Sequence, residues 1–405
     1  MTTQGTAAGL VDWRTVERLS ALIPAGPSAS RSARASSVAV LRRSAQEAPA
    51  WVARITGLNR ATQQAAETTR VSVVDRAGLV RASTRALRGL MEQVPAPQAS
   101  ETIQLVGAAE VAGAMSLLAT RLLGQVLPAA PSGPHGHGAG AADVAPPAGE
   151  GADAAAPATS PARDVTTGAG RDGAASPHLL LVAPNVLAVR RQMDLDMLDL
   201  PAWVCLHEMT HAVQLAAAPW LGPYLSDSMR MVIGAVVEAV YGGADGAGGE
   251  SSRGRGSRPR RGRAVRLAAR AGRGRVLESL MNVTDRAEVA SLAAALTFLE
   301  GHAEVVLDDV HPNRMPSVHR LRAVLSRSRA ADGGIGPGPG LGSLLLHRLM
   351  GLEAKEAQYA DGAAFVRSVV TRIGHEGLNA VWADPGLLPT PAELARPDVW
   401  VRRIS

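Results

Sequence analysis

The sequence predicts a mainly α-helical protein with a small β element. Helix start and stop signals recur along the 405 residues and separate long segments of helical character. Only two short runs are typical of strands, RVSVVD at residues 70–75 and LLLVA at residues 179–183. Aromatic residues make up 3% of the chain, so the core must be built mainly from Leu, Val and Ala.

The first 128 residues are expected to form the N-terminal helical part of the fold. Asp12 is a suitable N-cap for a first helix, which the sequence PAGP ends after about residue 23. The other helices predicted in this part cover residues 30–55, 79–94 and 101–127. The last of these is strongly apolar, which indicates a buried helix.

Two segments have compositions that do not support a hydrophobic core. Residues 129–177 consist mostly of Ala, Gly, Pro and Ser, and residues 242–275 are rich in Gly and Arg. Such segments bury too little apolar surface to offset chain entropy, so we expect a disordered insertion and a disordered loop. An Arg/Gly tract can bind nucleic acid through phosphates, but this one has no aromatic residue to stack on bases. A solvated loop is the preferred interpretation, and nucleic acid is not an expected partner.

Residues 199–219, DLPAWVCLHEMTHAVQLAAAP, are predicted to form a buried helix. Asp199 can cap its N-terminus, Pro201 suits the first turn, and Pro219 ends the segment. Apolar residues point in every direction, which is typical of a core helix. Its polar side chains therefore need partners, because an unpaired buried polar group costs roughly 1–3 kcal/mol. These polar side chains are His207, Glu208, His211 and Gln214.

The same helix carries the motif HExxH at His207, Glu208 and His211. Residues i and i+4 share one helix face, so both imidazoles can bind a single ion, and Glu208 is near enough to polarise a water on that ion. Two imidazoles on Zn²⁺ with a carboxylate as general base is the arrangement of metal-dependent peptide hydrolysis. The alternative is a pair of core histidines that other groups satisfy.

A catalytic zinc needs three protein ligands and one open position, and the candidates for the third lie in residues 298–309. Glu300 and His302 point about 200° apart on a regular helix, so they do not easily bind one ion together. Glu300 is the predicted ligand. Glu304, one turn further on, is then placed to accept a hydrogen bond from a ligand imidazole. His302 stays open as the alternative ligand.

Residues 178–405 as a whole are expected to form the metal-binding part. The strand at residues 179–183 either pairs with an extended substrate, as edge strands near a metal helix do, or is an ordinary buried strand. Gly374 is predicted to end a late helix as an αL cap, and Thr390 and Glu393 form a capping box. The further helices predicted cover residues 229–241, 277–309 (as two helices), 341–352 and 353–373.

The cellular compartment is predicted from the cysteine content and from the sequence near the N-terminus. Cys205 is the only cysteine, so no disulfide can form within the chain, which fits a reducing compartment. The start of the sequence does not resemble a signal peptide, and no run of about 18 apolar residues predicts a membrane span. The net charge of +6 arises largely in the Arg/Gly loop. We expect a cytoplasmic protein with no membrane partner.

Four stretches carry a specific resemblance to a known family. They are LLLVAPN (179–185), WVCLHEMTHAVQLAAAPWL (203–221), LEGHAEVVLD (299–308) and the tail at residues 365–401. They are similar to the actinobacterial zincin-like metallopeptidase type 2 family, whose members are labelled as zinc-dependent metalloproteases or as associated with deazaflavin-coenzyme biosynthesis. The resemblance implies a zincin-like fold with His207, His211 and Glu300 on Zn²⁺ and Glu208 as base. The two low-complexity segments look like insertions relative to the family.

The sequence therefore predicts a zinc metallopeptidase that acts on a peptide or protein. The alternative is a non-catalytic zincin-like protein whose structural zinc braces the core and which serves as a binding or regulatory partner. Neither the substrate nor the oligomeric state follows from the sequence.

Overall fold

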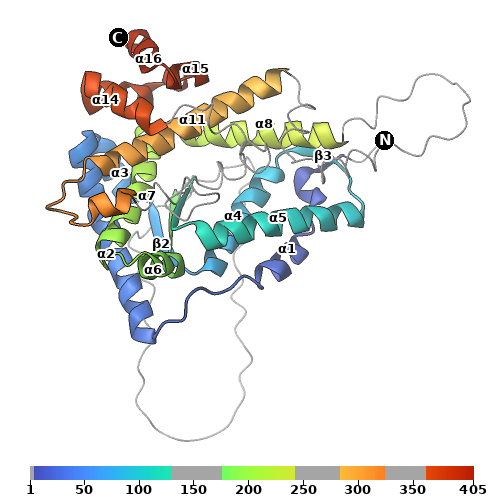
Figure 1. Cartoon of the computed structure of the whole chain (residues 1–405). Helices are drawn as coiled ribbons and strands as arrows, with labels where there is room; N and C mark the ends of the chain where they lie inside the picture. Colours follow the sequence, from blue (N-terminus) through green and yellow to red (C-terminus); the bar gives the residue numbers. More distant parts are fainter. Residues whose placement is uncertain (1–3, 129–175, 242–282, 324–361) are drawn as a thin grey trace, which may run out of the picture.

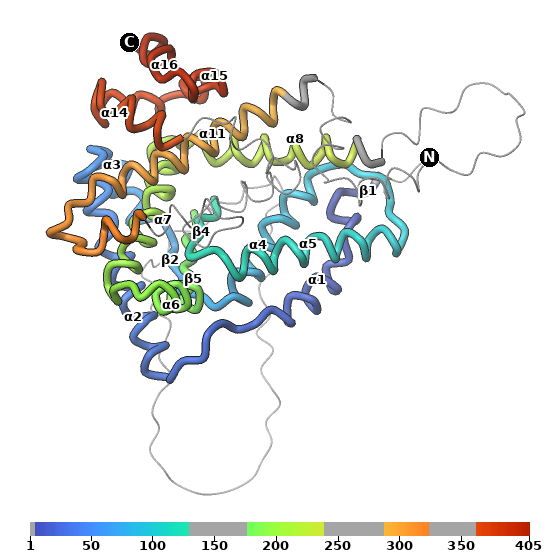
Figure 2. Tube along the Cα trace, in the orientation of Figure 1, coloured from blue at the N-terminus to red at the C-terminus, as the bar shows by residue number. Residues whose placement is uncertain are grey.

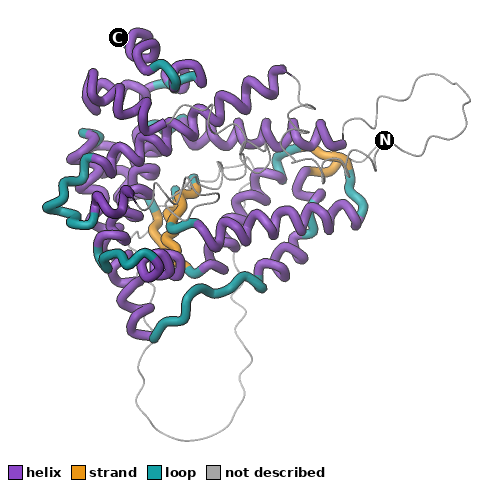
Figure 3. Tube along the Cα trace, in the orientation of Figure 1, coloured by secondary structure: helices purple, strands orange, loops and turns teal. Residues whose placement is uncertain are grey.

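The computed structural model describes residues 4–128, 176–241, 283–323 and 362–405. Helices make up most of these residues, and the strands form a three-stranded and a two-stranded sheet (Figures 1 and 3). The predicted mainly α-helical class is confirmed. The Ala/Gly/Pro-rich insertion (apart from its last two residues), the Arg/Gly loop and the predicted helix at 341–352 lie outside the described residues.

The N-terminal part begins as the capping residues predict. The carboxylate of Asp12 accepts hydrogen bonds from the backbone N–H groups of Arg14 and Thr15, and Ser30 caps the second helix in the same way. In order, its elements are β1 (Gln4–Thr6), η1 (Ala7–Leu10), α1 (Trp13–Ser20), α2 (Arg31–Thr56), α3 (Asn59–Thr68), β2 (Arg70–Val74), α4 (Arg76–Met91), β3 (Pro95–Pro97), α5 (Glu101–Arg121) and β4 (Gly124–Leu127).

The predicted helix over residues 101–127 is wrong in its last part. α5 ends at Arg121, and the chain then forms β4. β4 pairs antiparallel with β5 (His178–Val182), which places Gly124 opposite Leu181. A short apolar run fits a buried helix and a buried strand equally well by periodicity, so the pattern did not separate the two.

β5 is the central strand of the three-stranded sheet, whose order is β2-β5-β4. It pairs in parallel with β2 and antiparallel with β4, and four of its five residues are buried. The idea that this strand is a substrate-binding edge is therefore wrong, and the ordinary buried strand is correct. Within the described residues the edge strand beside the metal-motif helix is β4.

The helix with the HExxH motif, α7 (Asp199–Ala217), lies at the centre of the fold. It contacts α2, α3, β4 and the long helix α11 (Val283–Asp308), and Figure 2 shows α2 and α3 beside it. Asp199 is not its N-cap as predicted. Asp199 is already inside the helix, and its carboxylate accepts a hydrogen bond from the backbone N–H of Ser317. The carboxylate of Asp196 accepts hydrogen bonds from the backbone N–H groups of Leu198 and Asp199 at the start of the helix. The helix thus begins one residue earlier than predicted, and helix boundaries commonly differ by one or two residues.

α11 brings the second predicted site segment onto α7. Two helices were predicted over residues 277–309; residues 277–282 lie outside the described residues, and residues 283–308 form one helix. It runs beside α8 (Leu221–Tyr241) and against α14 (Gly362–Leu378), as Figure 1 shows. A Cβ on Gly301 would collide with the backbone of Gly362, so glycines at this crossing allow close helix packing.

The C-terminal segment covers the far side of α11. Gly374 breaks α14 with φ 70° and ψ 175°, so its φ is positive as predicted but its ψ lies outside the αL region, and the helix resumes as far as Leu378. The capping box of Thr390 and Glu393 is present. The remaining elements are α6 (Ala183–Gln192), η5 (Asn379–Ala383), η6 (Pro385–Leu387), α15 (Pro391–Leu394) and α16 (Pro397–Ile404).

In the described parts of the chain, two helices, Glu101–Arg121 and Ala287–Asp308, are long and apolar enough to cross a membrane by length and composition alone. Core helices of soluble proteins pass the same test, and most of the second helix is buried within the fold. The absence of a membrane partner stays a prediction.

Candidate metal centre

α7 and α11 bring the three predicted metal ligands together. The Nε2 atoms of His207 and His211 lie 3.2 Å apart. The carboxylate of Glu300 places Oε2 3.4 Å from His207 Nε2 and Oε1 3.6 Å from His211 Nε2. Among the described residues these three side chains form a group whose ligand atoms all lie within 4.8 Å of one another.

These distances fit a tetrahedral ion. Two ligand atoms that each lie about 2.1 Å from one tetrahedral centre are about 3.4 Å apart. The separation of 3.2 Å between the two imidazole nitrogens lies close to that value. Each nitrogen also has one carboxylate oxygen of Glu300 near that distance, Oε2 at 3.4 Å for His207 and Oε1 at 3.6 Å for His211. Two imidazole nitrogens and one carboxylate oxygen are also a donor set that zinc accepts, so the residues present fit the metal that the motif implies.

The group is exposed on one side only. The side chain of His207 is 4% exposed, that of His211 17% and that of Glu300 28%. Solvent therefore reaches the ligands from the side of Glu300 and His211, while His207 closes the inner side.

Glu208 is buried next to this group. Burial raises the pKa of its carboxyl to about 8; His207 opposes the shift and the carboxylate of Glu300 adds to it. A carboxyl with such a pKa can exchange a proton near neutral pH, as a general base requires.

Gly124 leaves the space that Glu208 occupies. A Cβ added at Gly124 would lie 2.6 Å from Cγ and 2.9 Å from Oε1 of Glu208. Gly124 was not predicted as a site residue, because residues 101–127 were expected to form one helix. The glycine inside an apolar run was the available signal, since such a glycine often marks a close approach of backbone to another group.

His302 lies outside the metal group. It is fully buried, and its Nδ1 lies 3.0 Å from Nε2 of Gln214. Burial lowers the pKa of His302 to about 3, so its imidazole is neutral. Burial is also the largest cause that lowers the pKa of His211, which favours the neutral form that a metal ligand needs.

Gln214 contacts the imidazole of a predicted ligand. Its Oε1 lies 2.9 Å from Nδ1 of His211. This kind of contact was predicted for Glu304, whose carboxylate accepts a hydrogen bond from Arg367 at 3.1 Å. A contact of Glu304 with a ligand stays a prediction. Gln214 could have been found from its position, three residues after His211 on the same helix face.

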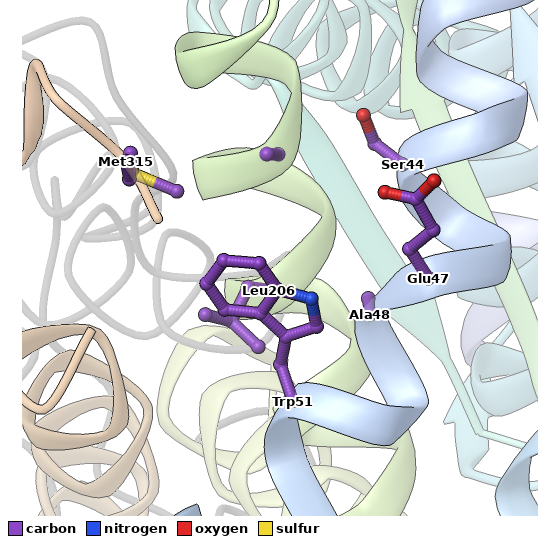
Figure 4. Close-up of a pocket in the computed structure, with 7 residues that line it drawn as sticks. Ser44, Glu47, Ala48, Trp51, Leu206 and Met315 are labelled. Atoms are coloured by element: carbon purple, nitrogen blue, oxygen red, sulfur yellow. The ribbon is translucent and has the colours of Figure 1, made fainter. Parts of the chain in front are cut away.

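A separate small cavity lies on another face of α7 (Figure 4). Its volume of about 20 Å³ suits roughly one water molecule, so it is not a substrate site. Its lining residues are Ser44, Glu47, Ala48, Trp51, Ala202, Leu206 and Met315, none of which belongs to the metal group.

Comparison with known proteins places the chain in a family. The sequence matches the zincin-like metallopeptidase family over residues 11–401. A solved structure from Chloroflexus aurantiacus, described as "a putative hydrolase with a novel fold", has a TM-score of 0.54 at 19% sequence identity, covering 97% of this chain and 98% of that one, and shares its fold. No curated protein matches the chain. The family match spans nearly the whole sequence, including both motif histidines and Glu300, and the chain belongs to the zincin-like metallopeptidase family.

Proposed function

We propose that this protein is a zinc-dependent metallopeptidase of the Glu-liganded type. His207, His211 and Glu300 would hold the zinc, and Glu208 would be the general base. The observation that carries the proposal is the convergence of two Nε2 atoms, 3.2 Å apart, on the two carboxylate oxygens of Glu300 at 3.4 and 3.6 Å, with one side exposed.

The residues divide the chemistry between them. Zinc bound at this group would supply a Lewis acid that polarises the substrate carbonyl and lowers the pKa of water. Glu208 takes a proton from the attacking water and passes it to the leaving amine. It must be unprotonated to do so, and a nearby divalent cation lowers the pKa that burial has raised.

The neighbouring edge strand supports a peptide as substrate. Within the described residues β4 pairs with β5 alone, and its first residue, Gly124, lies against Glu208. An extended segment that adds to this edge would begin beside the general base. Strand addition binds peptides through main-chain hydrogen bonds and accepts many sequences.

A non-catalytic role for the metal is the second candidate. It is favoured by the near-complete burial of His207 and Glu208, which is typical of a closed structural site. The exposure of Glu300 favours catalysis instead. The two candidates differ in whether water and an inhibitor can reach the metal.

The test combines metal content, inhibitor binding and turnover on the full chain. We expect about one zinc per chain, a change in the visible spectrum of the cobalt-substituted protein when a hydroxamate is added, and cleavage of a quenched-fluorescent peptide library. Chelation should abolish cleavage, and added zinc should restore it. Bound zinc with an unchanged spectrum and no cleavage would support the structural role. Absence of stoichiometric zinc would contradict both candidates.

A further inference from the structure

The amide of Gln214 contacts three groups at once. It is buried on α7, and its Oε1 lies 2.9 Å from Nδ1 of His211. Its Nε2 donates to the backbone carbonyl of Leu299 at 2.9 Å and lies 3.0 Å from Nδ1 of His302. One side chain thus joins a metal-ligand histidine on α7 to two residues that flank Glu300 on α11.

The carbonyl of Leu299 decides which way the amide points. A carbonyl oxygen only accepts hydrogen bonds, so the amide nitrogen of Gln214 must face it. The amide oxygen must then face His211, and since this oxygen only accepts, Nδ1 of His211 must carry the hydrogen. The lone pair of His211 is therefore on Nε2, the atom that lies 3.6 Å from Glu300.

The same amide fixes His302. Its Nδ1 faces an N–H donor and must accept, so the hydrogen of this imidazole lies on Nε2. His302 Nε2 is buried and has no hydrogen-bond partner among the described residues, so that atom favours neither tautomer. The contact with Gln214 therefore determines which nitrogen of His302 carries the hydrogen. The ring of His302 packs against Phe298 and Trp382, with centroids 6.4 and 5.3 Å away, which restricts its rotation.

We propose that Gln214 is a positioning residue that sets His211 in the tautomer a metal requires and ties α7 to α11 at the level of Glu300. The inference rests on the proposed metal site. A partner that orients a ligand imidazole typically affects metal affinity 10–100-fold. Gln214 is unusual because its own orientation is fixed by a main-chain carbonyl of the helix that carries the third ligand.

The first test measures the tautomers directly in the zinc-free protein. Long-range ¹H–¹⁵N spectra of ¹⁵N-histidine-labelled protein at about pH 8.5, above the ordinary His pKa of about 6.5, distinguish the two ring nitrogens. The signals are assigned with His211→Asn and His302→Asn variants. We expect His211 with its hydrogen on Nδ1 and His302 with its hydrogen on Nε2. A His211 ring protonated on Nε2 would overturn the proposal.

The second test uses two substitutions and a control on the same helix. Gln214→Met removes all three contacts and should weaken zinc binding about 10–100-fold in competition with a chromogenic chelator. Gln214→Glu keeps an acceptor for His211 but loses the donor, so His302 should shift its hydrogen to Nδ1. The control, Thr210→Val, removes a buried bond to the carbonyl of Leu206 and should bind zinc within about twofold of wild type.

The outcomes separate this inference from the proposed function. If wild-type protein binds no zinc while both tautomers are as expected, the metal site fails and the role of Gln214 in orienting His211 stands. If wild type and Gln214→Met bind zinc equally tightly, the positioning role is wrong and the metal site stands. Equal losses in Gln214→Met and Thr210→Val would indicate general loosening of α7 and would also overturn the positioning role.

Discussion

Two buried glutamates, Glu208 on α7 and Glu393 on α15, have pKa values shifted in opposite directions. Burial raises the pKa of Glu393, but hydrogen bonds from Arg403 and Thr390 outweigh it and hold that pKa below the ordinary value. Arg403 donates to both carboxylate oxygens, at 2.6 and 3.0 Å. Burial is the largest influence on Glu208 too, but the carboxylate of Glu300 adds to it, and the pKa rises to about 8.

The difference separates a stabilising carboxylate from one suited to catalysis. Glu393 has its charge neutralised in place, so it favours the folded state above the ordinary pKa of 4.5. Glu208 binds its proton more tightly in the folded protein than in the unfolded chain. The zinc-free protein should therefore lose stability as the pH rises from about 4.5 towards about 8. A group with a perturbed pKa beside a metal group is a candidate for proton transfer.

The largest expected effect comes from exchanging carboxylate for amide at Glu208. Glu208→Gln should keep stoichiometric zinc, because it changes no ligand, and should lower peptide hydrolysis about 10²–10⁴-fold, because general acid–base catalysis contributes on that scale. Metal analysis and turnover of a cleaved library peptide measure the two properties.

The matched control for this exchange is Glu393→Gln, which removes the other buried carboxylate. Hydrolysis per folded molecule should stay within about twofold of wild type, because Glu393 lies near the C-terminus and contacts Arg403. Turnover of Glu208→Gln equal to that of this control would refute the assigned role of Glu208.

The second effect is on stability. Glu393→Gln should lower the free energy of unfolding by about 1–3 kcal/mol at neutral pH, since it leaves the partly exposed guanidinium of Arg403 without its charged acceptor. The pKa of Glu393 is depressed, so the difference between variant and wild type should be present above about pH 4.5 and disappear as the pH falls through the folded pKa. Urea unfolding at several pH values measures it. A difference that persists at low pH would mean that packing, not the ion pair, carries the effect.

The sequence predicted most of the helices because their signals are local. The Asp12 cap, the Thr390 capping box and the positive φ of Gly374 were each read from a few adjacent residues. The errors lie where tertiary contacts decide. The apolar run after Arg121 became an edge strand because β5 was available to pair with it, and periodicity does not report the presence of a partner.

The candidate site divides in the same way. The residues His207, Glu208 and His211 follow from one helical spacing, and Glu300 was chosen by helix geometry within a single segment. Gln214 and Gly124 act through contacts with residues distant in sequence, 85 positions away in the case of Leu299. Membership of the zincin-like metallopeptidase family, which the resemblance implied, is confirmed. An actinobacterial origin and a link to deazaflavin-coenzyme biosynthesis stay predictions.

The smallest expected effect tests whether Gly124 holds open the place of Glu208. In Gly124→Ala the added Cβ would lie 2.6 Å from Cγ and 2.8 Å from Cδ of Glu208, so something must move. The nearest atom is Cγ, which is not the free end of the side chain, so the whole buried side chain of Glu208 must shift. A misplacement of about 1 Å can cost up to 10²-fold in rate, and we expect a loss of about tenfold here. Zinc affinity should stay unchanged, because the three atoms nearest the new methyl group all belong to Glu208, which is not a ligand.

Gly89→Ala provides the control, because a Cβ at Gly89 on α4 meets nothing within 4 Å. It should keep full turnover, with a slightly higher melting temperature, since Ala favours a helix over Gly by about 1 kcal/mol. If Gly124→Ala hydrolyses peptides as fast as Gly89→Ala, Glu208 does not need its observed position. A loss of zinc in Gly124→Ala would instead show that the methyl group disturbs the ligands, and the rate would then report the metal rather than the base. A slower Gly124→Ala enzyme with full zinc would tie the observed position of Glu208 to the reaction itself.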